Sequence, residues 1–284
     1  MLATPASILC RQIEERDLEA VGDLLTREFP ARTRAYWSEG LARLKAHTSP
    51  EGYPRFGYLL EVDGVVIGAV LLIFRTDGAG PRARIRCNVS SLCIDRAFRG
   101  HAVTLVRAAL KLERVTFVKL SAAARTWSIL EGRGFRRYSQ GQFVALPALS
   151  AGPGKIRPFG EADRDLPDFD LIKAHADVGC IALVCDTSEG HLPFVFIRRR
   201  LAYAPFGVMQ LIYCRDPGSF VQHAGALGRF LLRRGVVCVI CDAEAAIRGL
   251  AGWFVKDKVP RYYRGPDRPG LNDLAFTELV LFGP

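Results

Sequence analysis

The alternation of apolar and polar residues along the chain predicts short strands interspersed with amphipathic helices. The pattern predicts strands over residues 8–14, 58–62, 65–74 and 115–120 and helices over residues 14–28 and 33–47. Asp63-Gly64 separates two of these strands and favours a tight hairpin. Residues 136–146 are expected to form a further strand pair. Strands and helices thus share one chain, which indicates an α/β class.

The stretch from Arg84 to Thr104 combines an alternating strand, a turn and an apolar-periodic helix. A strand that feeds a glycine-containing turn and then a helix presents free backbone N–H groups and a helix dipole to an anion. The turn also carries Arg96 and Arg99, with His101 directly after it. The pattern therefore predicts a phosphate site.

The segment I-D-R-A-F-R-G-H-A-V-T resembles the pyrophosphate loop of the GNAT superfamily of acyl-CoA N-acyltransferases. The family pattern is Arg/Gln-x-x-Gly-x-Gly/Ala, and Arg99, Ala102 and Thr104 take its first, central and last positions. A strand, the helix segment T-W-S-I-L-E-G-R and Gly134-Phe135 follow in the order that the family shows. The resemblance implies a GNAT fold, an α+β arrangement in which a mixed sheet is flanked by helices.

The resemblance also implies how acetyl-CoA or another acyl-CoA would bind as co-substrate. The pantetheine arm would pair with the strand backbone at Leu92, Cys93 and Ile94. The pyrophosphate would bind the backbone N–H groups of the loop formed by Arg99, Gly100, His101, Ala102, Val103 and Thr104. No metal is expected, because no His or Cys cluster has metal-ligand spacing.

Three positions depart from the family's pattern. Ala102 replaces a glycine, Ala123 an asparagine that leads the next helix, and Leu130 the tyrosine that often serves as acid. Asp95 is the nearest carboxylate to the loop and is a candidate base, with an N-terminal helix cap as its alternative role. Tyr138 is a candidate acid, with core packing as its alternative role.

Arg84 and Arg86 alternate with Arg82 and therefore project from one face of the strand. Two interpretations of this face stand side by side. It is an anionic acceptor site, for example for an amine that bears a carboxylate, or it is a solvated edge face.

The second half of the chain repeats the first. Residues 93–122 align without a gap on residues 214–243, and residues 16–25 resemble residues 164–172. We therefore predict two tandem GNAT-like domains, over 1–148 and 156–284, joined by a Gly/Pro-containing linker at 149–155. The second loop lacks both arginines, which predicts that only the N-terminal half binds CoA.

Composition limits the class of protein. Of the 284 residues 49% are apolar, enough for a substantial core, and the longest apolar run is too short to span a bilayer. The start of the chain shows no signal-peptide pattern, so we expect a cytoplasmic protein. The eight cysteines lie mostly in apolar strands and are expected to be core residues.

The net charge of +10 indicates an anionic partner, for which the phosphates of acyl-CoA suffice. The basic clusters lack a nucleic-acid reading motif, so nucleic acid is not an expected partner. A membrane is not expected as a partner either. The sequence leaves the oligomeric state open, with a homodimer as one option.

The favoured function is transfer of an acyl group, in the simplest case acetyl, from acyl-CoA to an amine of a small molecule or protein. One alternative is a non-catalytic module of the same fold that binds an anionic ligand, a nucleotide or acyl-CoA. A second alternative is a tandem transferase that uses aminoacyl-tRNA.

Overall fold

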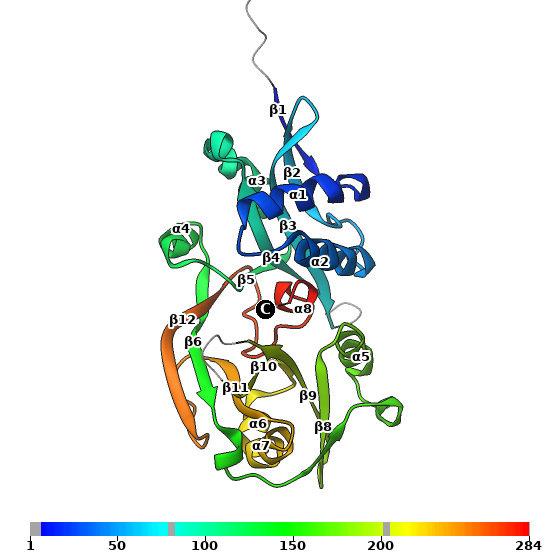
Figure 1. Ribbon diagram of the computed structural model, residues 1–284, viewed down its shortest axis with the longest axis vertical. Helices are drawn as coiled ribbons and strands as arrows, with labels where there is room; N and C mark the ends of the chain where they lie inside the picture. The colour runs from blue at the N-terminus through cyan, green and yellow to red at the C-terminus, as the bar shows by residue number, and fades with distance from the viewer. Residues whose placement is uncertain (1–6, 79–82, 201–204, 284) are drawn as a thin grey trace, which may run out of the picture. The chain divides into compact units, whose positions relative to one another are not determined.

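The computed structural model describes residues 7–78, 83–200 and 205–283. The contacts divide the chain into two compact units. Unit 1 comprises residues 1–120 together with 264–267 and 276–283, and unit 2 comprises residues 121–263 together with 268–275. Figure 1 shows each unit as a sheet with helices packed against it. No helix in the described part of the chain is long and apolar enough to cross a membrane.

Unit 1 is built on five strands in the order β1-β2-β3-β4-β5. The strands are β1 (Ile8–Gln12), β2 (Gly57–Val62), β3 (Val65–Asp77), β4 (Arg84–Ile94) and β5 (Val115–Lys119). The helices are α1 (Leu18–Glu28), α2 (Arg34–Ala46), α3 (Ala102–Leu110) and α8 (Glu278–Leu281), with 3-10 helices η1 (Glu15–Asp17) and η3 (Arg96–His101). The β4–β5 pair is parallel and the other ladders are antiparallel.

Both faces of β3 are buried in unit 1, as expected for a strand whose consecutive residues are apolar. Ala69, Leu71 and Ile73 lie in one core cluster with residues of α1 and α2, so these helices cover one face (Figure 1). Helix α3 contacts β2 and β3 and covers the other. The last segment of the chain completes the first face, because Leu281 and Phe282 belong to the same core cluster.

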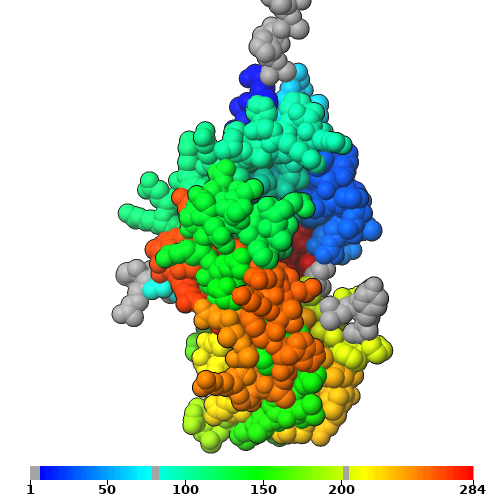
Figure 2. Space-filling model, turned by 90° about the vertical axis from the view of Figure 1, so that its left-hand side faces the viewer, coloured from blue at the N-terminus to red at the C-terminus, as the bar shows by residue number. Residues whose placement is uncertain are grey.

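Unit 2 has seven strands in the order β12-β6-β11-β10-β9-β8-β7. The strands are β6 (Arg136–Ala145), β7 (Lys155–Pro158), β8 (Ile181–Thr187), β9 (Gly190–Arg199), β10 (Gly207–Cys214), β11 (Val236–Ala243) and β12 (Gly252–Arg264). The helices are α4 (Trp127–Gly132), α5 (Phe169–Asp177), α6 (Pro217–Gln222) and α7 (Ala224–Leu232), with 3-10 helices η4 (Ala124–Thr126), η5 (Pro147–Leu149) and η6 (Glu161–Asp163). In Figure 2, β12 (orange) lies on the surface of this unit, where Trp253 is half exposed.

The predicted helices and the hairpin of the first half are confirmed. Local interactions explain where α2 begins and where the hairpin turns. The hydroxyl of Thr33 accepts a hydrogen bond from the backbone N–H of Tyr36 and caps α2. Asp63 and Gly64 both have positive φ, as a tight turn between two strands requires.

The predicted internal repeat is present in the structure. The gapless alignment places η3 on α6 and β5 on the beginning of β11. Continued at the same offset before residue 93, the alignment also matches the parallel ladders, because Asn88 pairs with Val118 in unit 1 and Met209 pairs with Val239 in unit 2.

The alignment of residues 16–25 with 164–172 is wrong by two residues. Arg11 pairs with Asp17 at 2.6 Å, and Arg157 pairs with Asp163 at the same distance. Each aspartate also accepts a hydrogen bond from the backbone N–H three residues before it. Asp17 therefore corresponds to Asp163. The Arg-Asp-Leu sequences at 16–18 and 164–166 are similar in sequence, but they do not occupy equivalent positions in the two halves.

Two further expectations about the middle of the chain need correction. Residues 136–146 form one strand, not two, because β6 is paired along both edges, with β11 and with β12. This pairing also puts β6 in unit 2, whereas the sequence placed the domain boundary after residue 148. The domain boundary at 148, which was inferred from the sequence repeat, stays a prediction. The two compact units divide after Leu120 instead.

The segment predicted as a linker is packed against α7. The carbonyl of Ala151 accepts a hydrogen bond from the backbone N–H of Gly225, and that of Pro153 lies 2.8 Å from the ring of His223. A Cβ on Gly225 would overlap the backbone of Ser150 and Ala151, and one on Gly228 would overlap the backbone of Pro147 and Ala148 just before this segment. The glycines of α7 thus allow the backbone before and within residues 149–155 to pack directly against the helix. The Gly/Pro-rich composition of that segment does not reveal this packing.

Candidate functional site

The strand β4 separates from β5 halfway along its length. The two strands pair only from Ile85 to Asn88, and in the described part of the chain no other strand pairs with the rest of this edge of β4. The opposite edge stays paired with β3 as far as Ile94. The β3–β4 register shifts by one residue near Ser90, so β4 carries a bulge there.

Lys119 lies at the point where β4 and β5 separate. Its Nζ donates hydrogen bonds to the carbonyls of Val89 at 3.0 Å and Ser90 at 2.9 Å. Two consecutive carbonyls face the same side because the bulge interrupts the usual alternation. An ammonium group has three donors, so one N–H of Lys119 remains beyond these two bonds. The hydroxyl of Ser90 is buried, and no described residue bonds it.

The loop after β4 has the predicted strand–turn–helix geometry. Asp95 accepts a hydrogen bond from the N–H of Ala97 at 3.3 Å and begins η3, which continues directly into α3. Arg96 and Arg99 are exposed and form no ion pair with any described residue. No atom lies within 4 Å of a Cβ placed on Gly100. The loop is therefore open and positively charged.

The substitution of alanine for the family's central glycine is compatible with this loop. Ala102 has φ −53°, an ordinary helical value, so a side chain at this position causes no strain. Val103 and Thr104 lie in the first turn of α3, where backbone N–H groups have no partner within the helix. His101 is exposed just before this turn.

The residues predicted to pair with the pantetheine arm differ in exposure. Leu92 is 38% exposed, whereas Cys93 and Ile94 are buried. Burial raises the pKa of the Cys93 thiol to about 12, so this thiol stays protonated at neutral pH. What these residues offer a ligand is therefore backbone rather than a nucleophile.

The two candidate catalytic residues both have the structural role that the sequence left open as an alternative. Asp95 caps η3 by accepting from the N–H of Ala97, and the aligned Asp216 caps α6 by accepting from the N–H of Ser219, in a loop without arginines. Tyr138 is 1% exposed and packs edge-on against Tyr263 in unit 2. The catalytic assignment of Asp95 and Tyr138 stays a prediction.

The two candidate substrate-binding arginines are paired within unit 1. Arg86 lies 2.7 Å from Asp77, and Arg84 lies 3.0 Å from Asp267. Both charges are thus paired with carboxylates of the same chain, Arg84 is exposed, and the substrate-binding assignment of the two arginines stays a prediction. Arg82 lies outside the described residues.

Unit 2 has the same strand separation, but its own chain fills it. Strands β10 and β11 pair only as far as Gln210 and Ile240. Beyond that point the N–H of Leu274 donates to the carbonyl of Ile212 at 2.7 Å, and Asn272 Oδ1 accepts from the N–H of Asp242 at 2.8 Å. Residues 272–274 therefore lie between the two strands.

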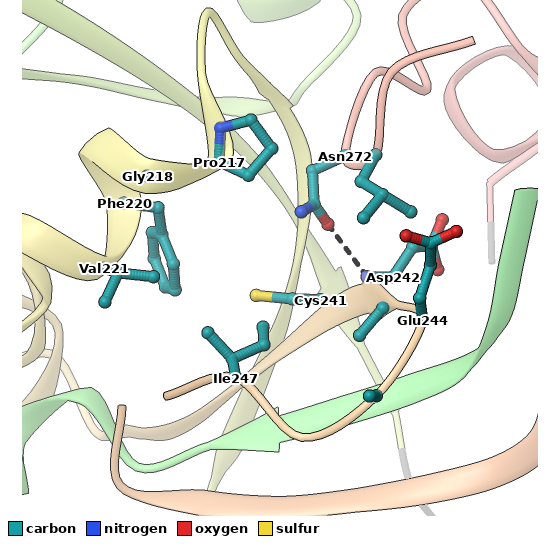
Figure 3. A pocket seen from close by; sticks show the side chains of 12 residues that line it. Pro217, Gly218, Phe220, Val221, Cys241, Asp242, Glu244, Ile247 and Asn272 are labelled. Carbon is teal, nitrogen blue, oxygen red and sulfur yellow. Dashed lines mark hydrogen bonds between the residues drawn. The ribbon is translucent and has the colours of Figure 1, made fainter. Parts of the chain in front are cut away.

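A pocket of about 300 Å³ remains beside this inserted segment. Figure 3 shows Pro217, Phe220 and Val221 of α6 on one side and Cys241 and Asp242 of β11 on another, with the Asn272 bond dashed. The loop of the second half thus encloses an apolar space instead of an exposed basic surface.

Sequence reasoning missed Lys119 and Asn272. Lys119 is the last residue of the apolar strand β5, where a lysine usually reaches solvent. Asn272 lies in a Gly/Pro-rich stretch without a periodic pattern. Only strand pairing between distant segments gives either residue its role. Among the described residues no three His, Cys, Asp or Glu side chains form a cluster that could hold a metal ion.

No family model and no curated protein sequence matches the chain. Solved structures match most of it. A GCN5-related N-acetyltransferase from Anabaena variabilis has a TM-score of 0.61 at 9% identity, over 91% of this chain and 72% of the other.

Two further matches have the same character. A GCN5-related N-acetyltransferase from Kribbella flavida has a TM-score of 0.54 at 14% identity, over 91% and 71% of the two chains. Eis1 from Mycobacterium abscessus has a TM-score of 0.52 at 13% identity, over 91% and 73%. The chain therefore has the GNAT fold in tandem, as the sequence predicted, and at these identities the likeness is one of fold.

Proposed function

We propose that the protein is an acyl-CoA-dependent N-acyltransferase that moves an acyl group, in the simplest case acetyl, to an amine. The observation that carries the proposal is the contrast between the two halves. In unit 1 the separated edge of β4 leads into an exposed loop with two unpaired arginines. In unit 2 the equivalent edge is filled by residues 272–274, and the loop has no arginine.

The residues of unit 1 fit an acyl-CoA. The pyrophosphate would accept hydrogen bonds from the backbone N–H groups of residues 99–104, and Arg99 would balance its charge. The backbone of residues 92–94 would bind the amide-containing pantetheine arm along the unpaired edge of β4. The buried Ser90 hydroxyl, which no described residue bonds, is a polar atom that a ligand at this edge would satisfy.

Acyl-CoA supplies an activated thioester, and the protein supplies position and charge. The remaining N–H of Lys119 would donate to the thioester carbonyl oxygen, on which negative charge develops as an amine attacks. The buried Cys93 thiol is protonated and does not compete as a nucleophile. Because an amine attacks a thioester readily, correct placement accounts for much of the rate.

The proposal is tested first by calorimetric titration of the whole protein with acetyl-CoA and with longer acyl-CoAs. We expect micromolar binding that Arg99→Glu weakens by about tenfold or more, since one phosphate contact becomes a repulsion. Arg233→Glu, exposed just after α7 in unit 2 and outside the loop, changes the net charge equally and serves as the control. Equal weakening in both variants, or no binding at all, would contradict the proposal.

A second candidate function is binding of an acyl-CoA or nucleotide without catalysis. The cap formed by Asp95 and the burial of Tyr138 favour it, because both candidate catalytic groups have structural roles. Release of free CoA thiol in the presence of a panel of primary amines separates the two functions. Tight binding without thiol release by any amine would favour the binding module.

The third option, an aminoacyl-tRNA-dependent transferase, gives a different result in the same titrations. It predicts RNA binding whose affinity falls steeply with salt, without measurable affinity for acyl-CoA.

A further inference from the structure

The pocket in unit 2 has one buried polar side chain that is directed into it. Asn272 lines the pocket and is 3% exposed. Its Oδ1 accepts a hydrogen bond from the backbone N–H of Asp242 at 2.8 Å. Because an N–H group can bond only the oxygen of an amide, this bond fixes the amide nitrogen on the opposite side of the group. Figure 3 shows this nitrogen turned toward the side of the pocket that α6 forms.

The amide nitrogen of Asn272 is unbonded and can be reached. No described residue accepts a hydrogen bond from Asn272 Nδ2. This atom retains accessible surface, whereas Asp242 Oδ1, which is also unbonded, retains none. The Asp242 side chain lies on the face of β11 opposite Cys241 and pairs there with Arg261. A molecule in the pocket therefore meets the donors of Asn272, and it needs an acceptor to bond them.

The backbone holds Asn272 in place before any ligand binds. Its φ of 57° lies in the left-handed region, which asparagine adopts more readily than most residues. Two residues later the N–H of Leu274 donates to the carbonyl of Ile212 at 2.7 Å and ties the segment to β10. A donor fixed in this way loses little freedom when it bonds a ligand, so binding costs less.

The other walls of the pocket are largely apolar. Phe220, Val221 and Ile247 line it, and Cys241 contributes a buried thiol. Burial raises the pKa of that thiol well above its ordinary value, so Cys241 is uncharged at neutral pH. A ligand in this space therefore needs an apolar body.

The charge and size of the pocket suit a small neutral molecule. Glu244 in its wall is paired with Arg268, so the described residues that line the pocket offer no free charge to an ionic ligand. An apolar cavity of about 150 Å³ holds a molecule of the size of benzene. The space here is about 300 Å³, which suits an aromatic or branched aliphatic group that carries one short polar substituent.

We propose that unit 2 has a binding site for a small neutral ketone or carboxamide with an apolar body, whose carbonyl oxygen accepts a hydrogen bond from Asn272 Nδ2. The segment that fills the strand separation of unit 2 thus also supplies the group that recognises the ligand. The inference does not depend on the proposed transferase function, because every residue involved lies in unit 2.

The test uses the full chain and four compounds of nearly equal shape, which are acetophenone, benzamide, isopropylbenzene and benzamidinium. Nuclear magnetic resonance titrations would follow the backbone amides of residues 218–221 and 241–245. We expect acetophenone and benzamide to bind to the wild type, because both present a carbonyl oxygen to Asn272. Benzamidinium is expected not to bind, because its donors would face those of Asn272 and its charge would have no partner.

The variant Asn272→Asp tests the group that recognises the ligand. An aspartate keeps an oxygen for the N–H of Asp242 and replaces the donors by a second acceptor. We expect acetophenone and benzamide to bind at least fivefold more weakly, since a hydrogen bond becomes a repulsion. The affinity for isopropylbenzene should change little, and benzamidinium should now bind, because its donors match the new carboxylate.

Two further variants locate the binding. Val221→Phe fills the pocket from α6, and we expect it to reduce the affinity for acetophenone at least tenfold. Leu232→Phe adds the same ring at a half-exposed position of α7 outside the pocket, and we expect it to leave the affinity unchanged. Melting temperatures show which variants keep the fold. If Asn272→Asp does not, the exclusion of benzamidinium by the wild type and the loss in Val221→Phe still decide the proposal.

Several results would overturn the proposal. Equal weakening of acetophenone and isopropylbenzene in Asn272→Asp would mean that Asn272 does not recognise the carbonyl group. Wild-type binding of benzamidinium as tight as that of benzamide would mean the same. Unchanged affinity for acetophenone in Val221→Phe would place the binding elsewhere. Absence of shifts at the pocket amides with every compound would mean that the pocket does not take ligands of this class.

Discussion

In the proposed acyl transfer, Lys119 is the positive charge that the structure holds at the strand separation of unit 1. It is held by the carbonyls of Val89 and Ser90, so its position is fixed by backbone and not by a mobile partner. If its remaining N–H bonds the thioester oxygen, Lys119→Met should lower kcat by about 10²–10³ with little change in the KM for acyl-CoA. Steady-state kinetics with an amine found in the thiol-release screen would measure this.

Controls separate this role from a structural one. Lys119→Arg keeps a donor and a positive charge and is expected to recover part of the activity. Lys111→Met removes an exposed lysine just after α3 and should leave kcat unchanged. If Lys119→Met lowers only the melting temperature and not kcat, the lysine merely satisfies the two carbonyls.

At the scale of elements, α8 is a short helix that unit 1 depends on. Asn88 Oδ1 accepts a hydrogen bond from the N–H of Glu278 at 2.7 Å and fixes its start. Phe282 packs with Trp37 at a ring-centroid distance of 5.7 Å, and a Cβ on Gly40 would overlap its ring. We expect Phe282→Ala to lower the free energy of unfolding by about 3–5 kcal/mol, the usual cost of removing a buried aromatic ring.

Urea denaturation followed by fluorescence would measure that cost. Phe206→Ala is the matched control, since Phe206 is 42% exposed and its removal leaves no cavity in a core. A loss below about 1 kcal/mol for Phe282→Ala would show that the end of the chain is not part of the core.

The elements that the sequence predicted well are those whose signals are local. Asp63-Gly64 determines a turn by backbone preference alone, and the apolar spacing of α1 and α2 predicts their buried faces. The strand pair expected at 136–146 was predicted incorrectly, and the packing of the predicted linker at 149–155 could not be foreseen, because distant partners decide both. These partners are β11 and β12 for the strand and the glycines of α7 for the segment.

The same distinction holds for the candidate site. The loop at 96–104 was predictable, since its arginines and helix start are consecutive. The ion pairs of Arg84 and Arg86 were not, because Asp267 and Asp77 come from other segments. The role of Lys119 likewise depends on where two strands part, which no single stretch of sequence records.

At the scale of the whole molecule, the order of the chain and the packing units do not coincide. Unit 1 takes Leu281 and Phe282 from the end of the chain, and unit 2 takes β6 from the first sequence repeat. Both ladder partners of β6 come later in the chain, and its Phe143 and Ala145 lie in the core of unit 2. A cut after residue 148 would therefore remove part of the core of unit 2 and leave β6 without its partners β11 and β12.

This arrangement predicts the behaviour of fragments. We expect the fragment of residues 1–148 to be less soluble than the shorter fragment of residues 1–120, because it adds a strand with two unpaired edges. We expect neither to unfold cooperatively, since both lack the aromatic and aliphatic side chains that the last segment supplies. Sedimentation and urea denaturation compare the two with the full chain. A fragment 1–148 that is soluble and unfolds cooperatively would show that the repeat, and not the packing unit, is the unit of folding.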